Sequence, residues 1–183
     1  MARAAAMPAP EEPSMRPLTT TTAILALLAL PGPARPALRS VRPFELNPMH
    51  SAAVEKALIG AGRRLERPQC RRIFSDFRDG SGVLLQDRLD ALSLSGPEYL
   101  SWIVFADGSR RRSCQGTDIM AVTAPGSRVV YVCGRRFLEA QQRSAAGAEV
   151  VVLHEALHTL GLGENPPDSR EITRQVTARC ASR

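Results

Sequence analysis

The sequence predicts an α+β fold in which helices pack around a short β-sheet, and three observations carry this prediction. Apolar residues recur at helical spacing near both ends of the chain, as at Val54, Leu58 and Leu65. A run of Trp, Ile, Val and Phe at 102–105 is typical of a strand, and two further short runs follow it. The chain has 183 residues, of which 44% are hydrophobic, enough for one domain with a single core.

The predicted elements follow start and stop signals along the chain. Asn47-Pro48 is typical of a helix start, and the apolar stripe behind it continues to about residue 66. The Asp79-Gly80-Ser81-Gly82 segment interrupts the pattern before the next helix. The elements expected after it are a helix over 83–92, a helical turn at 97–100, a strand at 102–105, a hairpin of 120–123 with 128–133, and helices at about 135–143, 145–160 and from Ser169.

One motif in the predicted helix 145–160 carries most of the chemical information. His154-Glu155-Ala156-Leu157-His158 has the pattern HExxH and contains two of the chain's three histidines. Imidazoles four residues apart on a helix lie one turn apart on the same face, where both can bind one Zn²⁺. The glutamate between them can take a proton from a zinc-bound water. The motif predicts Zn²⁺ as cofactor, His154 and His158 as ligands, and Glu155 as catalytic base.

The residues around the motif favour a buried helix. Val150, Leu153, Leu157 and Leu160 fall at helical spacing and form an apolar stripe that would pack into a core. The histidines lie on a neighbouring face, and Gly161 suits the C-terminal end of the helix.

This stretch resembles the zincin metallopeptidases, and two branches of that group imply different third ligands. Continued to Glu164, the sequence is similar to the metzincin pattern HExxHxxGxxH with Glu in place of the last His. That likeness implies that Gly161 permits a sharp turn and that Glu164 returns to the metal. In gluzincins the third ligand is a Glu on a later helix, which implies Glu171. Both remain candidates with Glu171 slightly favoured, and Asp168 is a third.

The approach to the motif is similar to the deuterolysin-type aspzincins, in which a strand ending in Cys precedes a short helix and the HExxH helix. Here the strand would end at Cys133, while the GTxxD motif of that family is absent, as is a Met after the motif for a metzincin Met-turn. The resemblances imply a small zincin-like domain over 47–183, with its short sheet packed beside the active-site helix. In zincins an extended substrate pairs with the sheet edge above that helix.

The N-terminal segment is predicted to direct export. Residues 23–30 form an apolar run that follows Arg16 and precedes a Pro-Gly-Pro-Ala sequence, which is typical of a signal peptide covering residues 1–34. The run is too short to span a bilayer, and a retained N-terminal anchor is the alternative. Residues 35–46 are expected to form an extended linker. Localisation is therefore predicted to be periplasmic or secreted, without stable membrane association once the signal is removed.

Four cysteines follow this segment, an even number that predicts disulfides in a small exported domain. Of the three possible pairings, the one favoured joins Cys114 to Cys133, before the motif helix. It also joins Cys70 to Cys180, which would tie the C-terminus to the first part of the domain.

The charge pattern does not indicate a nucleic-acid partner. The formal net charge is +6, but the arginine pairs are dispersed and lack interleaved aromatic residues, which indicates a solvated surface. The sequence thus predicts an exported zinc-dependent metallopeptidase acting on peptide or protein substrates, with Tyr131 as a candidate donor to the oxyanion. The alternative is an exported zinc-binding structural or interaction protein without turnover. Oligomeric state and cleavage specificity remain open.

Overall fold

The computed structural model describes residues 46–181. The predicted signal segment and the linker up to residue 45 lie outside the described residues. The elements, in order, are α1 (Pro48–Leu65), α2 (Pro68–Arg71), α3 (Ile73–Asp76), α4 (Leu85–Ala91), α5 (Gly96–Leu100), β1 (Val104–Asp107), the 3₁₀ turn η1 (Arg112–Gln115), β2 (Ala121–Val122), β3 (Val129–Val132), α6 (Gly134–Arg143), α7 (Ala145–Thr159) and α8 (Ser169–Cys180). The predicted α+β class is confirmed.

Helices α1, α7 and α8 begin where the sequence supplies a capping side chain. The Asn47 side chain accepts a hydrogen bond from the His50 amide, and Pro48 occupies the first turn of α1, where no amide donor is needed. Ser144 caps α7 by accepting from the Gly147 amide, and Asp168 caps α8 by accepting from the Glu171 amide. The predicted helix starts at Asn47-Pro48 and near residues 145 and 169 are therefore confirmed.

The sheet has three strands in the order β1-β3-β2. β1 runs parallel to β3, and β2 pairs antiparallel with the other side of β3. The first strand was predicted at 102–105 and lies instead at 104–107. The amides of Trp102 and Ile103 bond back to the Tyr99 and Leu100 carbonyls, so these two residues finish the turn after α5 instead of entering the sheet.

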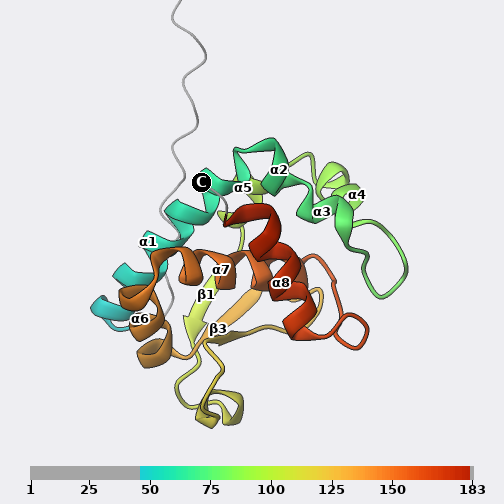
Figure 1. Ribbon diagram of the computed structural model, residues 1–183. Helices are drawn as coiled ribbons and strands as arrows, with labels where there is room; N and C mark the ends of the chain where they lie inside the picture. Colours follow the sequence, from blue (N-terminus) through green and yellow to red (C-terminus); the bar gives the residue numbers. More distant parts are fainter. Residues whose placement is uncertain (1–45, 182–183) are drawn as a thin grey trace, which may run out of the picture. The chain divides into compact units, whose positions relative to one another are not determined.

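α7 contacts both helices and strands of the described chain. It contacts α1, α6 and α8 (Figure 1), and it also touches β2 and β3. The predicted apolar stripe of Val150, Leu153, Leu157 and Leu160 is buried, as are the core aromatics Phe74, Phe105 and Phe137. The motif helix is thus fixed from several sides, and this rigidity determines where its polar side chains can point.

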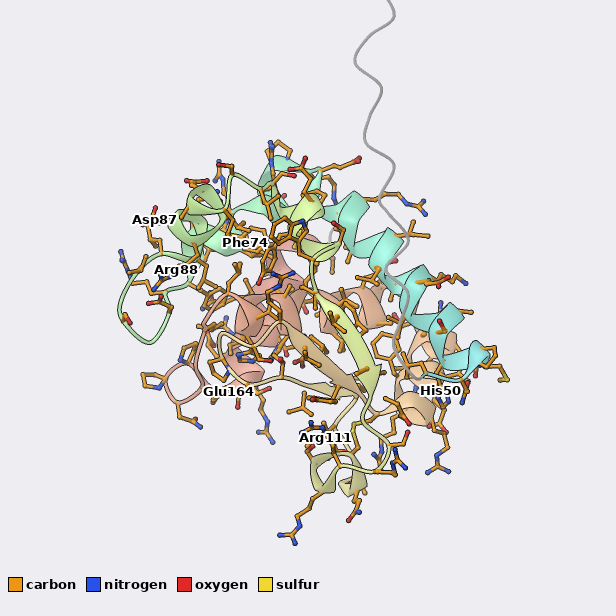
Figure 2. All side chains as sticks on the ribbon, turned by 180° about the vertical axis from the view of Figure 1, so that it is seen from behind. His50, Phe74, Asp87, Arg88, Arg111 and Glu164 are labelled. Carbon is orange, nitrogen blue, oxygen red and sulfur yellow. A yellow bond between two sulfur atoms is a disulfide. The ribbon has the colours of Figure 1, made fainter. Side chains whose placement is uncertain are left out.

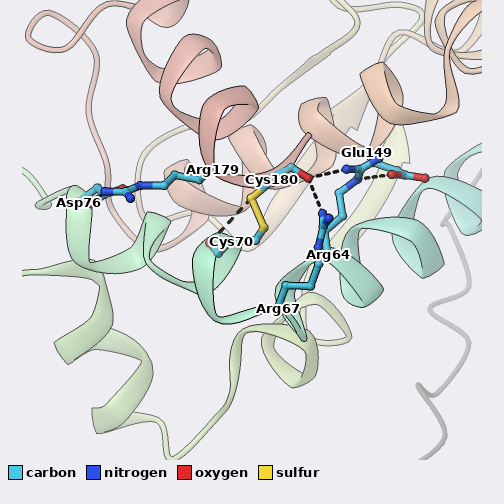
Figure 3. Close-up of a disulfide and its surroundings, with 7 residues drawn as sticks. All are labelled: Arg64, Arg67, Cys70, Asp76, Glu149, Arg179 and Cys180. Atoms are coloured by element: carbon cyan, nitrogen blue, oxygen red, sulfur yellow. Dashed lines mark hydrogen bonds and ion pairs between the residues drawn. A yellow bond between two sulfur atoms is a disulfide. The ribbon is translucent and has the colours of Figure 1, made fainter. Parts of the chain in front are cut away.

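Both favoured disulfide pairings are present (Figure 3 shows the first). Cys70–Cys180 joins α2 to the last residue of α8, and Cys114–Cys133 joins η1 to the residue before α6. The Cys180 carbonyl also accepts hydrogen bonds from Arg64 and Arg67. No helix within residues 46–181 has the length and apolar character needed to cross a membrane.

Candidate metal centre

The two motif histidines converge on one point. His154 and His158 lie one turn apart on α7, are both buried, and bring their Nε2 atoms to 3.0 Å from each other. This separation follows from the helix, because residues four apart share a face. The predicted pairing of the two imidazoles is therefore present in the structure.

The end of α7 brings a carboxylate to the same point. Gly161 has φ +111°, the Leu162 amide donates to the Leu157 carbonyl, and the Gly161 amide donates to the His158 carbonyl. These bonds end the helix in a tight glycine turn. The chain folds back at once, and Glu164 Oε1 lies 3.4 Å from His158 Nε2.

Each imidazole is held from behind through its other nitrogen. His158 Nδ1 lies 2.7 Å from the Leu162 carbonyl, which can only accept, so this nitrogen carries the proton and Nε2 of the neutral ring has a free lone pair. His154 Nδ1 lies 3.0 Å from Thr173 Oγ1 on α8. Such partners fix the orientation of histidines that bind metals. The glycine turn therefore supplies both the Leu162 carbonyl and the returning carboxylate.

The three donor atoms fit a tetrahedral cation. Ligand atoms about 2.0–2.1 Å from a tetrahedral Zn²⁺ lie roughly 3.3–3.5 Å from one another. Here the separations are 3.0 Å between the two Nε2 atoms, 3.4 Å from His158 to Glu164 and 3.9 Å from His154 to Glu164. The group His154, His158 and Glu164 could therefore hold one metal ion.

Glu155 lies beside this group without a partner for one of its oxygens. Its side chain is buried, and Oε2 has no hydrogen-bond partner among the described residues. In the metal-free chain, burial and then the nearby Glu164 carboxylate raise the pKa of Glu155 to about 8. Burial and then His158 lower the pKa of His154 to about 4, which keeps that imidazole neutral and able to ligate.

A hollow of about 160 Å³ opens beside His154 and Glu155. Its other walls are the segment 118–121, Val150 and Val151 of α7, and Ser169 and Thr173 of α8. The residue from the sheet is Ala121 of β2, which pairs only with β3 among the described strands. Among residues 46–181, the edge of β2 that is not paired with β3 therefore borders the hollow that His154 and Glu155 line.

The register of β2 determines which backbone groups face this edge. Ala121 lies opposite Val132, and the Cys133 amide donates to the Met120 carbonyl one position earlier. Hydrogen-bonded and non-hydrogen-bonded pairs alternate along an antiparallel ladder. The Ala121 N–H and C=O accordingly point away from β3, toward the open edge.

The other sequence candidates lie elsewhere. Glu171 accepts from Arg174 and Gln175, which lower the pKa of its carboxyl. Asp168 caps α8. The structure thus brings Glu164 to the histidines and leaves these two carboxylates in local contacts of α8. Tyr131 lies beneath the Arg111 guanidinium, whose carbon is 3.1 Å from the ring centroid; Arg111 and the exposed Glu164 are labelled in Figure 2.

Thr173 was not anticipated from the sequence. It lies 19 residues after His154 and belongs to no motif, so its contact depends on how α8 docks on α7. A threonine one turn after the start of a helix does not by itself indicate a contact with a histidine on another helix. The Leu162 carbonyl was likewise not anticipated, although the Gly161 turn that places it was expected.

Comparison of the chain with protein-family models, with curated proteins and with solved structures gives no match.

Proposed function

We propose that this protein is an exported zinc-dependent metallopeptidase whose metal is held by His154, His158 and Glu164. The observation that carries the proposal is the convergence of these three donors beside the buried carboxyl of Glu155. Two histidines with one carboxylate form a catalytic donor set, because the fourth position stays available to water. The side chain of Glu164 is partly exposed, so solvent can reach the donor atoms from the side on which Glu164 lies.

The residues of this chain have distinct roles in the proposed reaction. A zinc ion bound here would polarise a water and the substrate carbonyl. Glu155 accepts the proton of that water and passes it to the leaving amine. Its raised pKa in the metal-free chain means that it holds a proton readily, while a cation at the donor group would favour its charged form.

Substrate binding is assigned to the open edge of β2. An extended peptide that pairs with the outward N–H and C=O of Ala121 adds a strand to the sheet. Its backbone then lies over the hollow that His154 and Glu155 line. Recognition through the backbone suits a peptide substrate, because it holds the chain without requiring a particular side chain.

Export is supported by the cysteines and by the N-terminal sequence. All four cysteines are paired, which is compatible with an oxidising compartment. The apolar run at 23–30 is the expected signal.

The proposal is tested by metal content and hydrolysis together. Purified protein should contain about one zinc per chain and should cleave an unstructured protein substrate in a reaction that stops on chelation and resumes with added zinc. Glu155→Gln should retain zinc and lose about 10²- to 10⁴-fold in rate, since it removes only the proton acceptor. The exposed Glu55→Gln on α1 is the matched control. Zinc retained by a wild type that hydrolyses no peptide would instead establish the non-catalytic alternative.

A further inference from the structure

A second hollow, of about 480 Å³, lies next to the one that His154 and Glu155 line. It is bounded by α6 on one side and by residues 117–120 on the other, and it shares Asp118 and Met120 with the hollow at His154 and Glu155. A peptide lying along β2 can therefore extend from the metal group into this second hollow. We call it the α6 hollow.

The charged side chains that line the α6 hollow carry a net positive charge. Arg135, Glu139 and Arg143 follow one another at intervals of one helical turn, so one face of α6 lines the hollow, together with Arg136. Asp118 is the fifth charged group. Three guanidinium groups thus face two carboxylates.

The arginines are only partly neutralised by these neighbours. Arg135 lies 3.9 Å from Glu139 Oε1, and both side chains are largely exposed, so their pairing is weak. Arg136 donates to the neutral Cys114 carbonyl. Within residues 46–181, Arg143 has no carboxylate within 4.0 Å. Guanidinium groups bind carboxylates through paired hydrogen bonds, so the hollow favours a ligand that carries one.

The wall opposite α6 is held in place. The Cys114–Cys133 disulfide fixes η1 to the residue before α6, and Arg136 bonds across the same junction. The Cys133 amide also donates to the Met120 carbonyl. These ties hold residues 117–120 at a set position relative to α6, so the hollow is formed before any ligand arrives.

A more basic hollow exists on α1, but it has no connection to the motif. It is lined by Lys56, Arg63, Arg64 and Arg67 with Glu149, and it shares no residue with the hollow at His154. Arg64 is engaged there by Glu149 and the Cys180 carbonyl. This second basic surface serves as an internal control for any effect of bulk charge.

We infer that the α6 hollow is a substrate subsite that selects peptides carrying an Asp or Glu side chain near the scissile bond. The inference rests on the proposed peptidase function, because it assigns a substrate class to that site. Arg135 and Arg143 are the residues that determine this preference, since their guanidinium groups are the least engaged by the protein itself.

The first test compares matched peptides. Two unstructured peptides that differ only by Glu or Asp against Gln or Asn on either side of the cleaved bond should differ about two- to fivefold in kcat/KM, the acidic one being favoured. Arg135→Ala combined with Arg143→Ala should abolish this ratio, chiefly by lowering cleavage of the acidic peptide. Lys56→Ala with Arg63→Ala removes the same charge from the hollow on α1 and should keep the ratio. Equal cleavage of both peptides by the wild type, or equal loss in both double variants, overturns the subsite.

The second test measures binding without turnover. Calorimetry on the zinc-loaded Glu155→Gln protein should show tighter binding of the acidic peptide than of its amide counterpart, and this difference should vanish when Arg135 and Arg143 are replaced. If the wild type cleaves nothing while this arginine-dependent binding persists, the peptidase proposal fails, and the α6 hollow is a binding site for acidic peptides instead of a substrate subsite. If the two peptides bind alike, the subsite is overturned whether or not the protein cleaves peptides.

Discussion

At the scale of single residues, the third donor is the assignment that the sequence left open, chiefly between Glu164 and the slightly favoured Glu171, with Asp168 as a third candidate. The structure places Glu164 Oε1 3.4 Å from His158 Nε2, whereas the Glu171 carboxylate bonds Arg174 and Gln175. We therefore predict that Glu164→Ala lowers zinc affinity by on the order of a hundredfold or more, since it removes a ligand from a three-ligand set. Competition with a fluorescent chelator measures this loss.

Glu171→Ala is the matched control, because it deletes the same side chain from a position seven residues away. Zinc affinity should remain close to that of the wild type in this variant. A large loss in Glu171→Ala with none in Glu164→Ala would reverse the assignment.

The carboxyl group of Glu155 should make the free energy of unfolding of the metal-free protein depend on pH. Burial, and then Glu164, raise the pKa of this carboxyl from 4.5 to about 8 in the folded chain. Between these two values the unfolded chain releases the proton and the folded chain keeps it, so the free energy of unfolding falls as pH rises from about 4.5 to 8 and then levels. The Glu155→Gln variant has no carboxyl group at this position, so its free energy of unfolding should not show this decrease.

Urea unfolding in the presence of chelator measures the effect. The stability of Glu155→Gln relative to wild type should grow by up to several kcal/mol across that pH window. Saturating zinc should reduce the growth, because a nearby cation favours the charged carboxylate. Parallel stability curves for the two proteins without metal would show that Glu155 is not buried as described.

The sequence could predict those residues of the site whose relative positions follow from their spacing along one helix. His154, His158 and Glu155 share one helix, so their relative positions follow from helical geometry alone. Glu164 was one of three candidates for the third donor. A turn that ends a helix can be recognised from Gly161, but the path of the chain after that turn cannot. The contact of Thr173 with His154 requires two helices to dock, and no local pattern encodes that distance.

At the scale of elements, the turn that ends α7 also positions Glu164 beside the two histidines. Gly161 has φ +111°, and a Cβ there would lie 3.0 Å from the Asp79 Cβ. We predict that Gly161→Ala costs about 1–3 kcal/mol in stability and weakens zinc binding, because the strained turn would displace Glu164. Gly163→Ala is the control: no atom lies within 4 Å of its added Cβ. Similar effects for the two substitutions would mean that the turn does not position the carboxylate.

α8 contributes to the metal group through one hydroxyl. Thr173 Oγ1 lies 3.0 Å from His154 Nδ1 and orients the ring. Thr173→Val keeps the shape of the side chain and removes the hydroxyl, so zinc affinity should fall about tenfold or more by the same titration. Thr177→Val, one turn further along the exposed side of α8, should leave it unchanged. An unchanged affinity in Thr173→Val would remove α8 from the support of the site.

The elements that the sequence predicted well are those with caps and periodic apolar residues. α1 and α7 have both, and their starts were expected at Asn47-Pro48 and at about residue 145. α2 and α3 are four residues each, too short for a periodic pattern to appear, although Pro68 marks the start of α2. The parallel pairing of β1 with β3 is a long-range contact that strand composition does not encode.

At the scale of the whole described unit, two covalent ties support different parts of the proposed site. Cys70–Cys180 fixes the end of α8, which carries Thr173, and Arg64 and Arg67 reinforce it at the Cys180 carbonyl (Figure 3). Cys114–Cys133 fixes the wall of the α6 hollow. The first tie therefore supports the proposed metal donors, and the second supports the surface inferred to select the substrate.

The two disulfides should consequently differ both in stability and in function. Cys70–Cys180 closes a separation of 110 residues and Cys114–Cys133 one of 19, so chain entropy predicts that replacing both cysteines by Ser costs about 4–5 kcal/mol for the first pair and about 3 kcal/mol for the second. Urea unfolding of the two double variants measures this difference under non-reducing conditions.

Zinc titration of the same two variants separates their roles. Loss of Cys70–Cys180 removes the covalent anchor of α8 and leaves only its hydrogen bonds and ion pair, so it should weaken zinc binding through Thr173. Loss of Cys114–Cys133 leaves the donors in place and should instead reduce the preference for acidic peptides, because residues 117–120 are then no longer held against α6. If zinc affinity falls equally in both variants, the disulfides stabilise the fold as a whole and not separate parts of the site.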